Sequence, residues 1–302
     1  MTELGAINEQ LIKIALDHCP APGDHPTAIA GVAFYRRDEI NKADNCFYKP
    51  LASVILQGRK RSIWGNREYH YGRGQSIVNG VDMPSASFIT EASPEKPFLA
   101  ASLEIDSQLV TRLSAEVPPP KPAESFGTVA IAGTGAELLD AYLRLARLLD
   151  KPEQIPMLAP LIIREIHYRL LIGPQGEQLR LVNTLGSQSN QVAQAISWLK
   201  KNFTRPLEID ELARRVNMAT STFHRHFRNV TSLSPLQYQK YLRLYEAQRL
   251  MMVEKADALN ASLAVGYESP TQFNREYKRL FGEPPRRDVL RRGWPSQTAA
   301  EG

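Results

Sequence analysis

Two short segments of the sequence place hydroxyl and cationic side chains along one face of a predicted helix. In residues 221–231, Phe223, Phe227 and Val230 recur at helical spacing and form an apolar stripe. The opposite face is polar, and its members are Ser221, Thr222, His224, Arg225 and Arg228. Arginine can hold guanine O6 and N7, and hydroxyl or imidazole groups can meet bases or phosphates. The face therefore has the chemistry that a DNA major groove requires.

A second segment repeats this pattern in residues 270–281. Ser269 supplies an N-cap, Pro270 suits the first helical position, and Gln272 is placed to complete a capping box. Its apolar stripe contains Phe273, Tyr277 and Leu280, and its polar face contains Thr271, Gln272, Arg275, Lys278 and Arg279. One such face is typical of any solvated helix. Two copies in one chain favour a pair of DNA-reading helices.

Each segment follows a shorter predicted helix and a tight turn, so the sequence predicts two helix-turn-helix units. Asn217 in the first turn is a residue that tolerates the left-handed conformation. A long helix over residues 235–253 separates the units, and its predicted inward residues are Leu236, Tyr241, Leu244, Tyr245 and Leu250. At 1.5 Å per residue it spans about 28 Å. This approaches the roughly 34 Å repeat of B-DNA, so the two helices could enter successive major grooves.

Charge is distributed unevenly along the 302 residues. The chain carries a net charge of +5, but residues 186–302 hold 18 Lys and Arg against 11 Asp and Glu, while residues 1–185 are slightly acidic. A basic C-terminal third is typical of a module that faces phosphates. Its predicted phosphate contacts are Arg228, Lys240, Arg243 and Lys278.

The first 185 residues follow a different pattern. Between residues 27 and 104, short runs rich in β-branched and aromatic residues are separated by Gly, Asn, Pro and Ser, which predicts a small antiparallel barrel or sandwich. Gly65 and Asn66 form a two-residue hairpin signal. Two apolar helical patterns, 136–149 and 156–172, either cover this barrel or form a subunit interface. We expect an α+β chain with domains 1–185 and 186–302.

Residues that could hold a ligand or a metal are few in the strand-rich region. Tyr35, Trp64, Tyr69, His70 and Tyr71 are the aromatic and polar residues that could line a barrel pocket. His70 alone makes no metal site, and His224 and His226 point about 200° apart on a helix. Cys19 and Cys46 have no metal-ligand spacing, and their redox role stays open. No catalytic motif is present, so we expect a protein that is not an enzyme and has neither metal nor cofactor.

The residues after 190 resemble the DNA-binding domain of the AraC family of bacterial transcription regulators. The matching strings are STFHRHFRNVTSLSPLQYQKYLRLYEAQRLM and VGYESPTQFNREYKRLFGEPPRRD. Residues 30–105, with YKPLASVILQGRKRS and YGRGQSIVNGVDMP, resemble the N-terminal effector domain of that family, a cupin-like jelly roll. Matching the family's reading positions implies base contacts from Ser221, Thr222, His224 and Arg225, and from Thr271, Gln272 and Arg275.

The resemblance implies a cytoplasmic regulator, usually dimeric, that binds double-stranded promoter DNA and senses a small molecule or another cue. RNA polymerase is a partner if it activates. No run of residues is long and apolar enough to predict a membrane span. Two alternatives remain: a cupin-type enzyme fused to a DNA-docking module, and a helical scaffold that binds a protein partner without DNA. The sequence names no effector or target gene and does not decide activation against repression.

Overall fold

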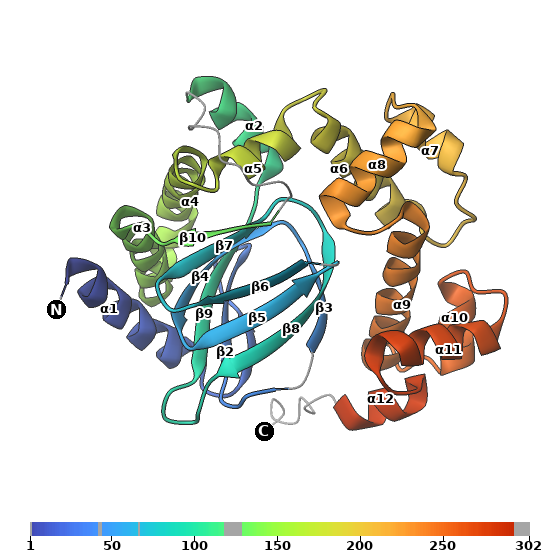
Figure 1. The fold of residues 1–302 in the computed structure, drawn as a ribbon. Helices are drawn as coiled ribbons and strands as arrows, with labels where there is room; N and C mark the ends of the chain where they lie inside the picture. The colour runs from blue at the N-terminus through green and yellow to red at the C-terminus, as the bar shows by residue number, and fades with distance from the viewer. Residues whose placement is uncertain (1, 42–43, 66, 118–128, 293–302) are drawn as a thin grey trace. The chain divides into compact units, whose positions relative to one another are not determined.

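The computed structural model describes residues 2–41, 44–65, 67–117 and 129–292. Its contacts divide the chain into two compact units, one of Met1–Ala193 with Arg225–Ser232, the other of Gln194–His224 with the residues from Leu233 onward. The N-terminal part contains two antiparallel sheets with flanking helices, and the C-terminal part is entirely helical (Figure 1). The predicted α+β fold class is confirmed. The predicted boundary at residue 185 stays a prediction.

The strands form a six-stranded sheet, in the order β1-β2-β9-β4-β7-β10, and a four-stranded sheet, in the order β3-β8-β5-β6. Their bounds are β1 Gly23–Pro26, β2 Val32–Arg37, β3 Asp44–Tyr48, β4 Leu51–Gln57, β5 Arg59–Trp64, β6 Arg67–Gly72, β7 Gln75–Asn79, β8 Met83–Glu91, β9 Phe98–Glu104 and β10 Val129–Gly133. The predicted hairpin joins β5 to β6, which pair from Trp64 opposite Arg67. Its residue Asn66 lies outside the described residues.

Three strands were not predicted from the sequence. β1 contains Pro26 and only polar or small residues, β3 is partly exposed throughout, and β10 is short and rich in Ala and Gly. None of them has the apolar alternation that marks a half-buried strand. Each nevertheless pairs antiparallel with a neighbour: β1 with β2, β3 with β8, and β10 with β7. Tertiary pairing, rather than local preference, makes these segments strands.

Strict alternation along the central strands gives the six-stranded sheet two different faces. Ala52, Val54 and Leu56 of β4 belong to the main apolar core, together with Leu11 of α1 (Glu3–His18) and Leu139 of α3 (Ala136–Arg147). The intervening residues, Leu51, Ser53 and Ile55, line a cavity on the other face. β2 and β9 alternate in the same way. Figure 1 shows α1 and α3 beside this sheet.

The remaining helices of this part are α2 Ser107–Glu116, α4 Ile155–Ile172 and α5 Gly176–Asn183, with short 3-10 turns between α3 and α4. Helix α3 buries most of its apolar residues in a core that it shares with α1, α4 and the sheet, and its Tyr142 hydroxyl donates to the carbonyl of Ala52 on β4 at 3.0 Å. This arrangement is consistent with a helix that covers the barrel. Helix α4 also contributes Ile166 and Leu170 to this core, but Met157 and Leu161 on its outer side are 76% and 64% exposed. Among the described residues, no helix is long and apolar enough to cross a membrane.

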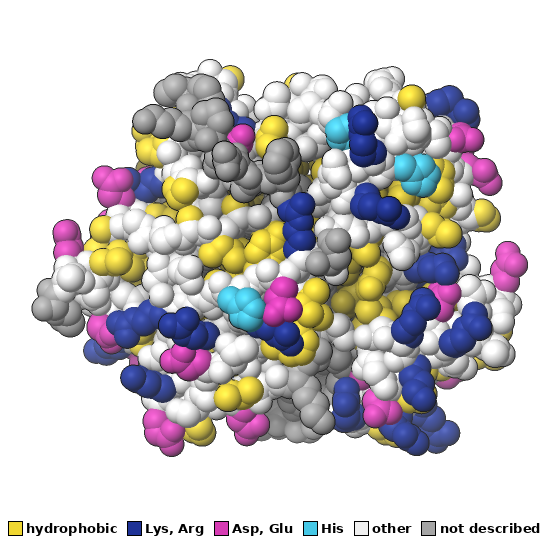
Figure 2. Space-filling view, in the orientation of Figure 1, with side chains coloured by type: hydrophobic (Ala, Val, Ile, Leu, Met, Phe, Trp, Pro, Cys, Tyr) yellow, Lys and Arg dark blue, Asp and Glu magenta, His cyan; other side chains and the backbone are white. Residues whose placement is uncertain are grey.

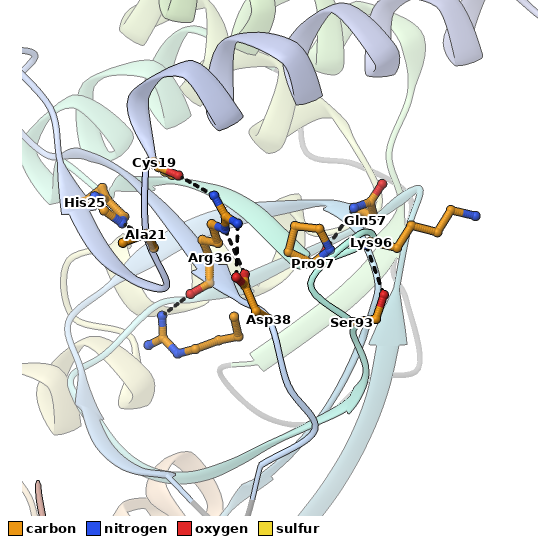
Figure 3. Close-up of polar contacts among 10 residues, drawn as sticks. Cys19, Ala21, His25, Arg36, Asp38, Gln57, Ser93, Lys96 and Pro97 are labelled. Atoms are coloured by element: carbon orange, nitrogen blue, oxygen red, sulfur yellow. Dashed lines mark hydrogen bonds and ion pairs between the residues drawn. The ribbon is translucent and has the colours of Figure 1, made fainter.

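Arg36 ties the end of α1 to the sheet. Its Nη1 donates to the carbonyl of Cys19 at 2.9 Å, while Nε and Nη2 donate to the two carboxylate oxygens of Asp38 at 2.8 and 3.0 Å (Figure 3). Burial raises the pKa of the Cys19 thiol to about 11, although the Arg36 charge lowers it. Burial and the Asp44 charge raise the pKa of Cys46 to about 12. Both thiols are therefore protonated at neutral pH and lack the thiolate that reactive cysteines use.

The C-terminal helices are α6 Gln188–Asn202, α7 Ile209–Arg215, α8 Thr220–Thr231, α9 Pro235–Val253, α10 Ala258–Ala264, α11 Pro270–Phe281 and α12 Pro285–Arg292. The predicted inward face of α9 is partly wrong, because Leu236 is 49% exposed while Tyr238 is fully buried. Buried residues occur on several sides of α9: Pro235, Tyr238, Gln239, Leu242, Leu244, Ala247, Gln248 and Met251. A helix packed on more than one side has no single apolar stripe.

Two glycines of this unit adopt the left-handed conformation in different surroundings. Gly266, between α10 and α11, has φ +87°, and a Cβ built there would lie 2.2 Å from the carbonyl oxygen of Thr204. Gly282, after α11, has φ +83° but no heavy atom within 4 Å of such a Cβ. The first glycine is required by backbone packing as well as conformation, and the second by conformation alone.

We expect Gly266→Ala to destabilise the protein more than Gly282→Ala. The left-handed conformation costs an L-residue about 1–2 kcal/mol at either site. Overpacking against the Thr204 carbonyl adds about 1–3 kcal/mol at Gly266 alone. Urea unfolding of the full chain, followed by circular dichroism at 222 nm, measures both. Equal losses of unfolding free energy would contradict the packing argument.

Candidate nucleic-acid interface and ligand cavity

The first helix pair, α7 and α8, meets at a tight turn. Asn217 has φ 56°, which confirms its predicted left-handed conformation, and the N–H of Met218 donates to the carbonyl of Ala213 at 2.9 Å. Thr220 Oγ1 donates to Asp210 Oδ1 at 2.7 Å, linking the beginnings of the two helices. Helix α8 begins at Thr220, so Ser221 lies in its first turn and is not an N-cap residue.

Helix α8 separates its side chains as predicted. Phe223 and Phe227 are fully buried and Val230 is buried, whereas Ser221, Arg225 and Arg228 are exposed. Thr222 and His224 are partly exposed beside them. The pKa of His226 is lowered, first by burial and then by the Arg225 charge, so its imidazole is neutral at pH 7. The predicted reading residues of this helix therefore share one accessible, cationic side.

In the second helix pair, α10 and α11, the helix α11 begins with an N-cap residue. Ser269 accepts from the backbone N–H of Gln272 at 3.3 Å, which confirms the N-cap. The predicted capping box is wrong, because the Gln272 amide donates to Glu276 Oε1 at 3.2 Å. A complete capping box occurs instead at the start of α9, between Ser234 and Gln237. Thr271 and Arg275 are exposed, so the predicted reading residues again lie on the open side.

A buried carboxylate joins α11 to α9. Glu276, 5% exposed, accepts from Lys240 Nζ at 2.7 Å and from the Tyr267 hydroxyl at 2.8 Å. Burial raises the pKa of Glu276, but hydrogen bonds from Lys240, Tyr267 and Gln272 outweigh it and hold the pKa below its ordinary value. Glu276 is therefore ionised at neutral pH, and its charge is matched by Lys240.

Arg243 of α9 is held by backbone carbonyls. Its guanidinium donates to the carbonyl oxygens of Phe203, Thr204, Arg205 and Gly266 at 2.7–3.1 Å. This network fixes the chain after α6 and the turn before α11.

Lys240 and Arg243 were predicted to contact phosphates, and the structure gives both an internal role. Arg228 and Lys278 are exposed and have no ion pair among the described residues, so they suit the phosphate role better. In Figure 2, Lys and Arg side chains, in dark blue, gather over α11 and α12.

A cavity of about 400 Å³ lies between the two sheets of the N-terminal part. Of the five predicted lining residues, Tyr35, Trp64 and Tyr71 line it, whereas Tyr69 and His70 do not. His70 is exposed and its Nε2 lies 2.8 Å from Glu68 Oε1. No group of three His, Cys, Asp or Glu side chains in the described ranges is arranged to hold a metal.

The sequence reasoning missed Lys60 and Tyr48, the polar pair in this cavity. Lys60 Nζ donates to the Tyr48 hydroxyl at 2.8 Å and lies 5.3 Å from the centre of the Tyr48 ring. Burial raises the pKa of Tyr48, so this phenol is neutral at pH 7. Lys60 lies four residues before Trp64 on β5, and this even spacing places both on one face. Tyr48 lies on β3, which the sequence did not predict.

Family comparisons agree with this architecture. Residues 28–178 match the model of the AraC-type transcriptional regulator N-terminus, and residues 212–290 match a helix-turn-helix domain. The chain belongs to the AraC family. A transcriptional regulator named ArgR from Pseudomonas aeruginosa is 30% identical over 120 residues, covering 40% of this chain and 36% of ArgR. The activator RhaS from Yersinia pestis is 28% identical over 99 residues, 33% of this chain and 36% of RhaS. The match thus spans about a third of the length of these curated relatives.

Solved structures resemble the fold of nearly the whole chain. Apo ToxT from Vibrio cholerae superposes with a TM-score of 0.57 at 11% identity, covering 88% of this chain and 99% of ToxT. ToxT bound to an unsaturated fatty acid gives a TM-score of 0.54 at 10% identity, covering 86% and 94%. At this identity the likeness shows the fold alone. The superposition covers 88% of this chain, so it includes residues of both the strand-containing part and the helical part.

We expect Lys240→Met to destabilise the protein and Lys278→Met to leave its stability unchanged. Removing the Lys240 ammonium leaves the buried Glu276 carboxylate under-paired, at a cost of about 1–3 kcal/mol. Lys278 is the matched control because it is an exposed lysine on α11. Urea unfolding of the two variants measures the difference. A Lys240→Met variant as stable as the wild type would show that the ion pair is not needed.

Proposed function

We propose that this AraC-family protein is a sequence-specific DNA-binding transcription regulator that acts in the cytoplasm. The observation that carries the proposal is the pair of helices α8 and α11, each with a buried aromatic stripe and an exposed polar side, in units joined by the 19-residue helix α9. A helix of this length spans about 28 Å, close to one turn of B-DNA. Residues 186–302 then form the DNA-binding domain and residues 1–185 the sensing domain.

In this proposal the two helices divide the work of recognition. Ser221, Thr222, His224 and Arg225 of α8 contact base edges, and Thr271, Gln272 and Arg275 of α11 do the same in the next major groove. Arg228 and Lys278 contact phosphates, which makes affinity fall as salt rises. The side-chain amide of Gln272 contacts a base only after it releases its hydrogen bond to Glu276. RNA polymerase is a further partner if the protein activates transcription.

We expect Arg225→Ala to lose about 1–3 kcal/mol of binding free energy and to relax base preference at one position of the site. Selection of bound sequences from a random duplex library, followed by fluorescence anisotropy at fixed salt, measures both. Arg249→Ala is the control, because Arg249 is an exposed arginine of α9 already paired with Glu246 and Glu254. If Arg225→Ala selects the same motif with the same affinity, the assignment of α8 is wrong. If the wild type selects no motif, the chain acts as a scaffold for a protein partner.

The alternative that the protein is an enzyme depends on which residues line the cavity of the N-terminal domain. A cupin-type enzyme requires a metal or another reactive group among the residues that line the cavity between the sheets. Those residues include three carboxylates, Lys60, one Cys and several hydroxyl groups but no His, so they lack the histidine ligands of a cupin-type metal site. A sensing role needs only a ligand that favours one conformation over another. The lining therefore supports the regulator over the enzyme.

We also propose that the protein forms a homodimer through α4. Met157, Leu161, Tyr168 and Ile172 lie along one stripe of this helix and are 40–76% exposed. A row of large apolar side chains in solvent is typical of an interaction surface. A second copy would present the same stripe, as a two-fold interface requires.

We expect Leu161→Glu to convert the dimer to a monomer, because it places a charge in the centre of the apolar stripe. Sedimentation equilibrium measures the mass. Leu185→Glu is the control, since Leu185 is 77% exposed and lies outside α4. A wild-type monomer, or a Leu161→Glu dimer, would contradict this interface.

A further inference from the structure

Lys60 is a cation without a carboxylate partner in the cavity between the two sheets. Its side chain lines the cavity, and its hydrogen-bond partner is the neutral Tyr48 hydroxyl. Within the described part of the chain, no carboxylate oxygen lies within 4.0 Å of its Nζ. Such a charge is costly to keep away from water unless an opposite charge meets it.

The acidic residues that line the same cavity are engaged elsewhere. Asp24 accepts from Arg37 at 2.5 Å, and Glu104 accepts from Lys49 at 2.9 Å. The negative charge of Asp44 also raises the pKa of Arg37. Asp24 and Glu104 thus form ion pairs with other cations, and the Lys60 side chain lines the cavity without a carboxylate partner. An ammonium has three N–H donors, and the Tyr48 hydroxyl uses one of them.

The surroundings of Lys60 are suited to keeping its charge. The ammonium lies 6.0 Å from the centre of the Phe98 ring, a distance at which an aromatic face attracts a cation. The Tyr48 hydroxyl is in turn 3.3 Å from Ser87 Oγ, so the phenol is held in place from a second strand. The Lys60 head is thereby positioned by β3, β8 and β9 around it.

The rest of the cavity wall is mainly apolar. Ile55, Ile77, Ile89 and Trp64 come from four different strands and surround the space of about 400 Å³. That volume lies within the range of small-molecule pockets, which combine an apolar lining with a few polar groups that orient the ligand. Among the described cavity-lining residues, Lys60 is the basic residue that lacks an acidic partner. A single ammonium matches a single negative charge, whereas a phosphate is usually held by several cations or by a bidentate arginine.

We propose that Lys60 binds the carboxylate of a monoanionic effector whose apolar body fills the cavity between the sheets. This inference rests on the proposed function, because it names the chemical class of the cue that the regulator senses. The carboxylate takes up the two remaining Lys60 N–H donors. The apolar body contacts Trp64 and the isoleucines, and Tyr48 holds the lysine in position.

The test compares acids with their neutral amides. The probes are decanoate, 3-phenylpropanoate and 1-naphthylacetate, each paired with its primary amide, and isothermal titration calorimetry on the full chain gives Kd. We expect at least one acid to bind the wild-type protein at least tenfold more tightly than its amide. Lys60→Met should abolish this preference and Lys60→Arg should keep it. Lys151→Met is the control, because Lys151 is an exposed lysine of the same domain, away from the cavity lining.

Several results would overturn the proposal. They are failure of every acid to bind the wild-type protein, equal binding of acids and amides, and an acid preference that survives Lys60→Met. If circular dichroism shows that Lys60→Met does not fold, the wild type and Lys60→Arg test the proposal instead. Both must then prefer the acid to its amide. DNA selection is measured separately. A chain that selects a DNA motif but binds no acid contradicts only the Lys60 assignment. A chain that binds acids but selects no DNA motif contradicts the proposed function as a transcription regulator.

Discussion

The alternation of side chains along β2, β4 and β9 is the constraint on which the N-terminal domain depends. Each strand gives one set of residues to the core under α1 and α3, and the other set to the cavity. A shift of one residue in register would exchange the two sets and expose the core face. The covered face stabilises the sheet through apolar burial, which leaves the opposite face available for polar groups such as Ser53, Ser102 and Tyr35.

In the C-terminal domain, short helices rather than strands must be held at defined positions around α9. Here buried polar contacts supplement the apolar cluster of Leu244, Phe273 and Tyr277. Glu276 links α11 to α9 through Lys240, and Arg243 gathers four backbone carbonyls from two separate turns. These contacts are directional, so they fix orientation in a way that apolar packing alone does not. The exposed sides of α8 and α11 stay available for a ligand of opposite charge.

Much of this architecture could be predicted from local patterns. The helices around Phe223 and Phe273 follow from apolar residues at helical spacing, and the caps at Ser269 and Asn217 follow from the backbone preferences of those residue types. The central strands follow from alternation. β3 could not be predicted because it lacks alternation, and Tyr48 was missed with it. Lys60 was missed because a lysine in a strand is ordinarily on a solvated face, and alternation alone does not say which face is inward.

The sequence by itself determined the order of the two domains, the two helix-turn-helix units and the membership of the AraC family, since these rest on spacing within short segments. Only the tertiary structure decided how individual charges are used. Lys240 and Lys278 look alike in sequence, yet one pairs with a buried carboxylate 36 residues away and the other is exposed. Tyr69 and Tyr71 share a strand face, yet only Tyr71 reaches the cavity. Such differences depend on contacts between residues far apart in the chain, which no local pattern contains.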